Sequence, residues 1–390
     1  MANKYKFPDN LESLKSVVLK SIDPIKPISD RTVADDNFLF SAQETKAGNS
    51  LPEFYLCYFL LVDLLGFKNI GQSEKISWSV PIDYMGIAFL IEHRKMGLGV
   101  FAHDAKTQEK DTEEIVSRIR NAVKLARPYF EWRAQEAAKQ SELNVINHSR
   151  SLYNRYEFFQ SEYRRVMQEV EKETDHLIRN EHGRDILLPI WVNKLKRNAE
   201  WLALAALDSF FSWTEHIFIH LAILRGRTIT GEEVADLAHQ NWSEKYKAAI
   251  DIKSKEGKEW HDQLVIIRRQ LRNYITHGAF GKTGEAFSFH SGAGAVPMQM
   301  YNQKGKGRFS FYKDLGFDEQ EIIELLQKFI KYLWSKEREP GRVYVESDLP
   351  LILPMAKDGT YRRKMKSVKS MKEFVMNLSW QFTNAGNMDF

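Results

Sequence analysis

Cysteine is almost absent from the chain, since its 390 residues contain only Cys57. A single thiol excludes an internal disulfide framework and a zinc site built from cysteines, and it fits a reducing compartment. The first residues, 1–6, lack the apolar segment of a secretory signal peptide. The longest apolar run, 201–224, contains Asp208 and Glu215, which are costly at bilayer depth. We therefore expect a soluble, cytoplasmic protein with no membrane partner.

Neither sign of charge dominates the composition. The 56 Lys and Arg residues nearly balance 52 Asp and Glu residues, which leaves a net charge of +4 and implies no nucleic-acid partner by itself. Apolar residues make up 43% and charged residues 28%, which excludes collagen, a coiled-coil rod and wholesale disorder. At roughly 150 residues per domain, two or three domains are expected.

Residues 1–110 are predicted to form an α+β domain. Ile76, Trp78 and Val80 alternate with serines, the period of a half-buried strand. Apolar runs at 87–91 and 100–102 predict further strands of a small antiparallel sheet, and 51–66 predicts a buried helix. The role of this domain is open: it could sense a trigger, bind a regulatory partner or restrain the rest of the chain.

From residue 111 onward the pattern becomes helical, which makes the whole chain mainly α. A long helical connector is predicted over 111–188, because apolar residues are sparse and three or four apart from 141 to 180. Residues 189–337 are predicted to form a bundle of about four helices with a Gly-rich insertion at 281–316. Residues 338–390 are a C-terminal extension with short β-like runs at 343–345 and 349–353.

One predicted helix, 258–277, carries two polar stripes beside its apolar face. Their members are Arg269, Asn273 and His277 on one stripe, and Arg268, Arg272 and Thr276 on the other. Residues four apart on a helix are neighbours, so arginine, amide and imidazole groups gather at its C-terminal end.

These groups suit the cleavage of RNA without a metal ion or other cofactor. Histidine can serve as acid or base near neutrality, and the arginine fork matches phosphate geometry and stabilises developing charge. One histidine cannot easily supply both the acid and the base, but a two-fold dimer would bring a second copy to the same place.

The segment from Arg272 to His277 reads R-N-Y-I-T-H and resembles the R-x4-H motif of the HEPN superfamily, in which asparagine is favoured after the arginine. The helices that precede the motif also look similar, so the resemblance spans about 190–337. It implies a HEPN-like helical bundle and a metal-independent endoribonuclease that acts as a homodimer or higher oligomer, with RNA as its partner. Many members are toxins or effectors of antiviral and abortive-infection defence.

The same resemblance suggests roles for individual residues. Arg272 would contact the scissile phosphate, His277 would be the acid or base, and Asn273 would hold one of them in place. Glu215 is our candidate for the further polar residue that members carry on an earlier helix. Supporting or RNA-contacting roles would fall to Arg268 and Arg269.

Other interpretations of these residues remain open. A histidine at a helix C-terminus is favoured by the helix dipole alone, by about 0.3–1 kcal/mol. The bundle could also be a non-catalytic module that binds RNA or nucleotide, or that dimerises, and acts as a sensor or scaffold. His216 and His220 have a spacing that can hold zinc, but no third ligand stands at a motif distance, so no metal site is expected. Ala279 stands where HEPN toxins controlled by adenylylation carry tyrosine.

Overall fold

The structure is a computed structural model that describes residues 7, 9–180, 189–277, 287–291, 294–300, 309–310 and 319–388. Side chains are not described for 176–180, for 270–277 or for the three strands within 287–310, Phe289 excepted. The chain divides into two compact units. The N-terminal unit contains Met1–Gln140 and Asn377–Phe390, and the helical unit contains Ser141–Met376. As predicted, the protein is mainly helical, with an antiparallel sheet near its N-terminus.

The N-terminal unit is built around a five-stranded sheet in the order β1-β3-β4-β5-β2. Every neighbouring pair of these strands is antiparallel. The strands are β1 (Ile25–Pro27), β2 (Gln43–Glu44), β3 (Ile76–Tyr84), β4 (Ile87–Arg94) and β5 (Gly97–Ala102). Met85 and Gly86 both have positive φ, which gives the tight β3–β4 hairpin a twist that matches the strands. The three strands that we predicted from alternation and apolar runs are confirmed as β3, β4 and β5.

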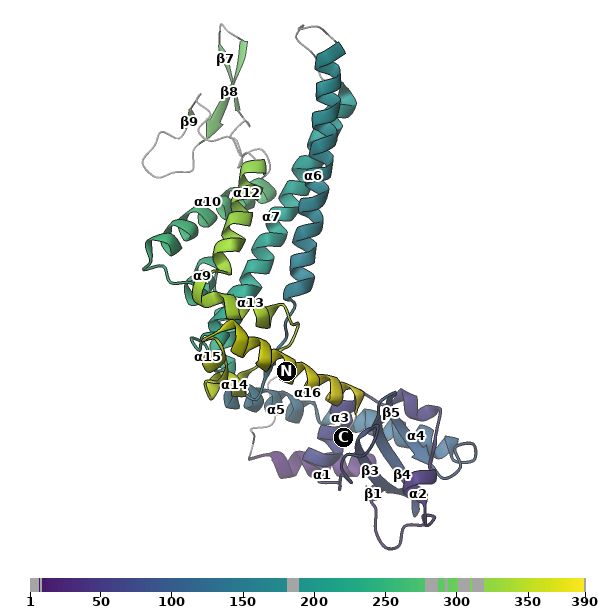
Figure 1. Cartoon of the computed structure of the whole chain (residues 1–390). Coiled ribbons are helices and arrows are strands. Elements are labelled where there is room, and N and C mark those ends of the chain that lie inside the picture. Colours follow the sequence, from purple (N-terminus) through teal and green to yellow (C-terminus); the bar gives the residue numbers. More distant parts are fainter. Residues whose placement is uncertain are drawn as a thin grey trace. The chain divides into compact units, whose positions relative to one another are not determined.

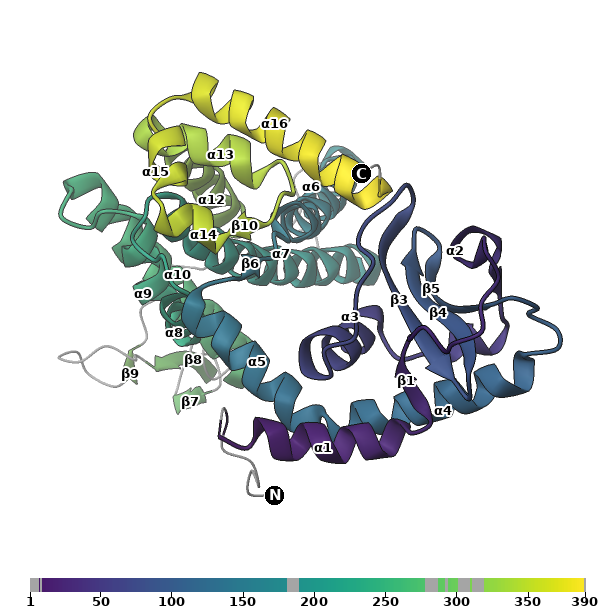
Figure 2. The ribbon, with the colours of Figure 1, turned by 90° about the horizontal axis from the view of Figure 1, so that it is seen from below.

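Helices cover this sheet, and the side-chain alternation of the strands decides what each face contacts (Figure 2). Phe89 and Ile91 of β4 join a core with α1, α3, η2 and α4, whereas Ala88 and Leu90 pack on the opposite face beside Phe38 of α2. The elements are α1 (Leu11–Ile22), α2 (Phe38–Ser41), η1 (Ala47–Ser50), α3 (Phe54–Tyr58), the π-helical η2 (Phe59–Leu64), α4 (Glu109–Leu125) and α5 (Arg127–Gln140). The helix predicted over 51–66 is thus present as α3 and η2.

A pair of long helices forms the spine of the helical unit (Figure 1). α6 (Ser149–Asn180) and α7 (Ile190–Leu224) run side by side. The 32 residues of α6 span about 48 Å. Tyr156, Tyr163 and Val166 of α6 are buried, as the predicted spacing requires. Of the residues for which we predicted a connector, those in α4 and α5 belong to the N-terminal unit and those in α6 to the helical unit.

Shorter helices pack around this spine. They are α8 (Gly231–His239), α9 (Trp242–Ala249), α10 (Lys255–His277), α12 (Glu319–Leu333), η3 (Lys336–Arg338), α13 (Glu339–Val345), α14 (Leu353–Lys357) and α15 (Thr360–Lys364). The last helix, α16 (Val368–Asn387), begins in the helical unit, and its residues from Asn377 onward belong to the N-terminal unit. The four helices predicted for 189–337 are confirmed as α7, α9, α10 and α12. α8 was not predicted, although Thr230 and Glu233 form a capping box at its start.

Short strands complete the helical unit. β6 (Asn144–Val145) pairs with β10 (Leu351–Ile352), so the predicted β-like run at 349–353 contains a strand. The run at 343–345 was wrongly predicted as a strand. It lies in α13, where Tyr344 and Val345 are buried and tertiary packing outweighs local β propensity. In the predicted insertion, β7 (Phe287–Ser291), β8 (Gly294–Met300) and β9 (Phe309–Ser310) form an antiparallel sheet, and the rest of 281–316 lies outside the described residues.

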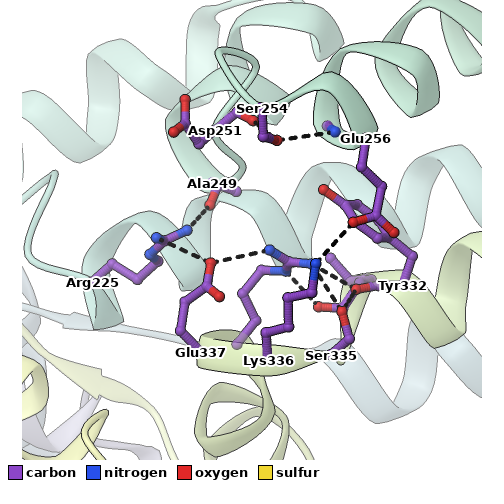
Figure 3. A network of polar contacts seen from close by, with 12 residues as sticks. Arg225, Ala249, Asp251, Ser254, Glu256, Tyr332, Ser335, Lys336 and Glu337 are labelled. Carbon is purple, nitrogen blue, oxygen red and sulfur yellow. Dashed lines mark hydrogen bonds and ion pairs between the residues drawn. The ribbon is translucent and has the colours of Figure 1, made fainter.

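Arg338 binds the backbone at the C-terminal end of α12. Its side chain is 4% exposed and donates hydrogen bonds to the carbonyl oxygens of Leu333 and Tyr332, at 2.9 and 2.7 Å. The guanidinium also lies 4.6 Å from the centroid of the Tyr332 ring. Glu337 beside it pairs with Arg225 at the end of α7, and Arg225 in turn donates to the carbonyl of Ala249 (Figure 3). This network fixes the junction of α7, α9 and α12.

No helix in the described part of the chain is both long enough and apolar enough to cross a bilayer.

Candidate functional site

The predicted motif lies in the last turns of α10. Ser254 caps the start of this helix by accepting a hydrogen bond from the Gly257 amide at 3.1 Å, and Leu264 and Ile267 bury its apolar face. The backbone of Arg272, Asn273 and His277 is helical, as predicted. The side chains of these three residues lie outside the described residues, as do Gly278 and Ala279, so their predicted clustering stays a prediction.

Glu215 lies where α7, α9 and α10 meet, and it contacts α10 one turn before the motif. Its carboxylate on α7 accepts a hydrogen bond from the ammonium of Lys245 on α9 at 2.9 Å and another from the guanidinium of Arg268 on α10 at 2.8 Å. Arg268 is four residues before Arg272 and therefore on the same side of the helix. Two residues that we singled out from the sequence, Glu215 and Arg268, are thus in direct contact. Arg269, the third, is exposed.

Lys245 is the member of this cluster that sequence reasoning missed. Its side chain is only 8% exposed, which is rare for lysine, because Glu215 compensates its charge. The sequence around it, Ser243 to Tyr246, gave no sign that this lysine is buried while Lys247 is one-third exposed. The distinction depends on how α9 packs against α7, which local patterning does not encode.

We expect Glu215→Gln to lower the free energy of unfolding by about 2 kcal/mol, because it leaves the mostly buried ammonium of Lys245 without a counter-charge. Urea unfolding followed by circular dichroism measures this change. Glu259→Gln is the matched control, since that carboxylate is 58% exposed on α10 and should change stability little. Lys245→Met should cost less than Glu215→Gln, because Glu215 keeps Arg268 and partial contact with water. Equal losses for all three variants would contradict this account of the cluster.

A serine, a histidine and an aspartate also meet between α9 and α10. The Oγ of Ser243 is 2.6 Å from Nε2 of His261, whose Nδ1 is 3.0 Å from the carboxylate of Asp262. Two observations argue against a nucleophilic triad here. Asp262 is 52% exposed and shared with Lys258, and the two backbone amides that follow Ser243 are already bound to Asn241, so they cannot stabilise an oxyanion. We interpret this contact as packing between the two helices.

Three histidines gather where the chain enters α6. The backbone amide of His148 donates to Nε2 of His216 at 3.0 Å, and Nδ1 of His220 lies 3.0 Å from the His216 carbonyl oxygen. Burial lowers the pKa of His216 to about 3 and that of His220 to about 4. An Nε2 that accepts a hydrogen bond carries no proton, so the geometry also requires neutral His216. Among the described residues, no group of three His, Cys, Asp or Glu side chains is arranged to hold a metal ion.

Neutral burial of His220 predicts that stability falls at acid pH. Between pH of about 6.5 and 4 the unfolded chain binds a proton at His220 and the folded chain does not. The contribution of this residue to the free energy of unfolding should therefore be complete above this window and fall by up to about 1.4 kcal/mol per pH unit within it, and neutral His216 should add a similar slope. Urea titrations at pH 7, 6 and 5 measure the slope. His220→Gln should remove about half of this slope, whereas His239→Gln, which changes an exposed histidine, should leave it unchanged. Equal slopes for both variants would contradict the assignment to His220.

Comparisons with protein-family models, with curated proteins and with solved structures each give no match.

Proposed function

We propose that the protein is a metal-independent endoribonuclease of the HEPN type. The observation that carries this proposal is the position of Arg272-Asn273-Tyr274-Ile275-Thr276-His277 at the C-terminal end of α10, in a unit made mainly of packed helices. The step of five residues from Arg272 to His277 corresponds to about 7.5 Å of helix rise. An RNA phosphate and its neighbouring ribose are of similar size, so one strand can contact both residues.

The contact of Glu215 with Arg268 and Lys245 supports the same proposal. It joins α10 to α7 and α9 directly before the motif, so the C-terminal turns of α10 extend from an anchored helix. A rigid supporting element is what catalytic groups need in order to hold their geometry. In this proposal Glu215, Lys245 and Arg268 are positioning residues, and Arg272 and His277 are catalytic residues.

The proposed reaction is an internal transesterification. One His277 accepts the proton of the ribose 2′-hydroxyl, and the 2′-oxygen attacks the adjacent phosphorus. Arg272 stabilises the charge on the non-bridging oxygens, and the bond to the 5′-oxygen breaks as that oxygen takes a proton from an imidazolium. The products are a 2′,3′-cyclic phosphate and a free 5′-hydroxyl. Unpaired RNA is the expected substrate, because its backbone can reach in-line geometry.

A homodimer completes the proposed site. A two-fold axis at the ends of two α10 helices would supply one histidine as base and the other as acid. The N-terminal unit would then carry a trigger-sensing or partner-binding role in a toxin or antiviral-defence effector, which is the setting that the HEPN resemblance suggests.

Incubation of purified protein with unpaired RNA in excess EDTA tests the proposal. We expect cleavage that leaves 2′,3′-cyclic phosphate ends and that is lost in the Arg272→Ala/His277→Ala double variant. Arg155→Ala is the control, because Arg155 is exposed on α6 and has no part in the proposed site. Cleavage that EDTA abolishes, or that the double variant retains, would refute the proposal. Binding of RNA without cleavage would instead support the non-catalytic module.

A further inference from the structure

A second site candidate is a cavity of about 670 Å³ in the helical unit. It lies among the first turns of α6, the middle of α7, the C-terminal end of α12 and α13. Its volume falls within the range of about 300–1,000 Å³ that small-molecule sites occupy. Aromatic and cationic side chains stand out among the residues that line it, and both kinds come from the start of α6 and the end of α12.

The aromatic part of the cavity comes from three rings. Trp213 of α7 is buried, and it is flanked by Tyr153 of α6 and by Trp334, which directly follows α12. The ring centroids lie 5.0 Å apart for Tyr153 and Trp213 and 6.4 Å apart for Trp213 and Trp334. The indole N–H of Trp213 is engaged with Ser149 Oγ at 3.3 Å, which fixes this ring in place. The ring planes are inclined by 53° and 65°, and Tyr153 and Trp334 are only partly buried, so the face of either of these two rings is available to a planar ligand while Trp213 packs between them.

The cationic part consists of Arg150, Lys331 and Arg342, with Glu346 as the one lining carboxylate. Nε of Arg150 is 3.1 Å from the carboxylate of Asp348, and Nε of Arg342 is 2.6 Å from that of Glu346. Each guanidinium group has five N–H donors. These contacts therefore hold both guanidinium groups in place and leave other N–H groups of each free to bind a ligand. Lys331 is exposed, and its ammonium makes no ion pair with another described residue.

The cavity is separate from the motif on α10. α10 and α12 run antiparallel, because Trp260 stacks on Tyr332 at 5.8 Å and Glu256 pairs with Lys336 at 3.0 Å. The Lys331 and Trp334 side of the cavity therefore lies toward the N-terminal end of α10. Arg272 follows Trp260 by twelve positions, which corresponds to about 18 Å along the helix axis.

We propose that this cavity binds a nucleoside 5′-monophosphate, with the base against Tyr153, Trp213 and Trp334 and the phosphate among Arg150, Lys331 and Arg342. A planar ring and a dianion in one molecule match the two kinds of lining. Neither a free phosphate nor a nucleoside would use both. The proposal goes beyond RNA cleavage and does not depend on it.

Calorimetric titration of the full-length protein tests the proposal with the four 5′-mononucleotides, adenosine and inorganic phosphate. We expect at least one mononucleotide to bind about tenfold or more tightly than adenosine or phosphate alone. Lys331→Gln should weaken that mononucleotide about tenfold, the loss expected for one charge-assisted hydrogen bond, and should leave adenosine unchanged. Lys328→Gln is the matched control, since Lys328 is exposed on the same helix but does not line the cavity.

The aromatic part is tested by replacing Trp334. Trp334→Ala should weaken both the mononucleotide and adenosine, whereas Trp334→Phe should retain most of the binding because the phenyl ring still stacks. Circular dichroism shows whether each variant is folded. Absence of binding by all four mononucleotides, equal affinity for phosphate and mononucleotide, or an equal effect of Lys328→Gln and Lys331→Gln would overturn the proposal.

Discussion

His277→Ala is expected to lower the rate of RNA cleavage at least about a hundredfold, because general acid–base groups contribute roughly 10²–10⁴-fold to such reactions. In a composite dimer site the substitution removes both imidazoles, the one that accepts the 2′-hydroxyl proton and the one that protonates the leaving 5′-oxygen. RNA binding should change much less, since Arg272 and the other cations remain. Cleavage rates and RNA affinity, measured separately on the same preparation, distinguish these two effects.

His239→Ala is the matched control for this substitution. His239 is the exposed last residue of α8 and belongs to neither the motif nor the buried histidines, so its removal should leave the cleavage rate unchanged. A cleavage rate for His277→Ala within a factor of two of the unmodified protein would exclude His277 as the acid or base. An equal loss in both variants would point to a general effect on folding instead.

The largest expected effect on stability follows from Arg338. Arg338→Ala should lower the free energy of unfolding by about 3 kcal/mol, because it leaves the buried carbonyl oxygen of Leu333 without this donor and removes a charged donor from the carbonyl of Tyr332, which keeps only its hydrogen bonds from Ser335. It also removes the guanidinium from the face of the Tyr332 ring. Urea unfolding measures the loss as a shift of the midpoint.

Two comparison variants make the Arg338 prediction specific. Arg338→Lys keeps the charge but not the planar fork that reaches both carbonyls, so it should lose a large part of the same stability. Arg155→Ala, on the exposed surface of α6, should stay within about 0.5 kcal/mol of the unmodified protein. A midpoint for Arg338→Ala that matches that of Arg155→Ala would contradict the role assigned to this network.

The periodicity of apolar residues correctly predicted those helices and strands whose type follows from their own residue pattern. Ile76, Trp78 and Val80 alternate because β3 has a buried face, and α7 ends where Gly226 adopts a positive φ of 68°. The strand prediction for 343–345 was wrong because Tyr344 and Val345 are buried in α13 by contacts that are distant in sequence. Local preference decides an element only when tertiary packing agrees with it.

The candidate site likewise has a part that the sequence predicted and a part that it did not. Glu215 and Arg268 were chosen from the sequence and lie 2.8 Å apart, because one polar face of α7 meets one polar face of α10. The buried state of Lys245 and the convergence of Tyr153, Trp213 and Trp334 at one cavity could not be predicted, since these side chains come from helices whose packing only the folded chain defines.

A crosslink between two copies of residue 277 tests the central claim of a shared site most directly. Cys57 is buried, and burial raises the pKa of its thiol to about 12, so it should not compete for a maleimide. We expect His277→Cys to form covalent dimers rapidly with a short bis-maleimide. Lys255→Cys, at the opposite end of α10 where the side chain is 90% exposed, should not. If His277→Cys stays monomeric at concentrations at which the unmodified protein cleaves RNA, or crosslinks no faster than Lys255→Cys, two α10 ends do not form one site.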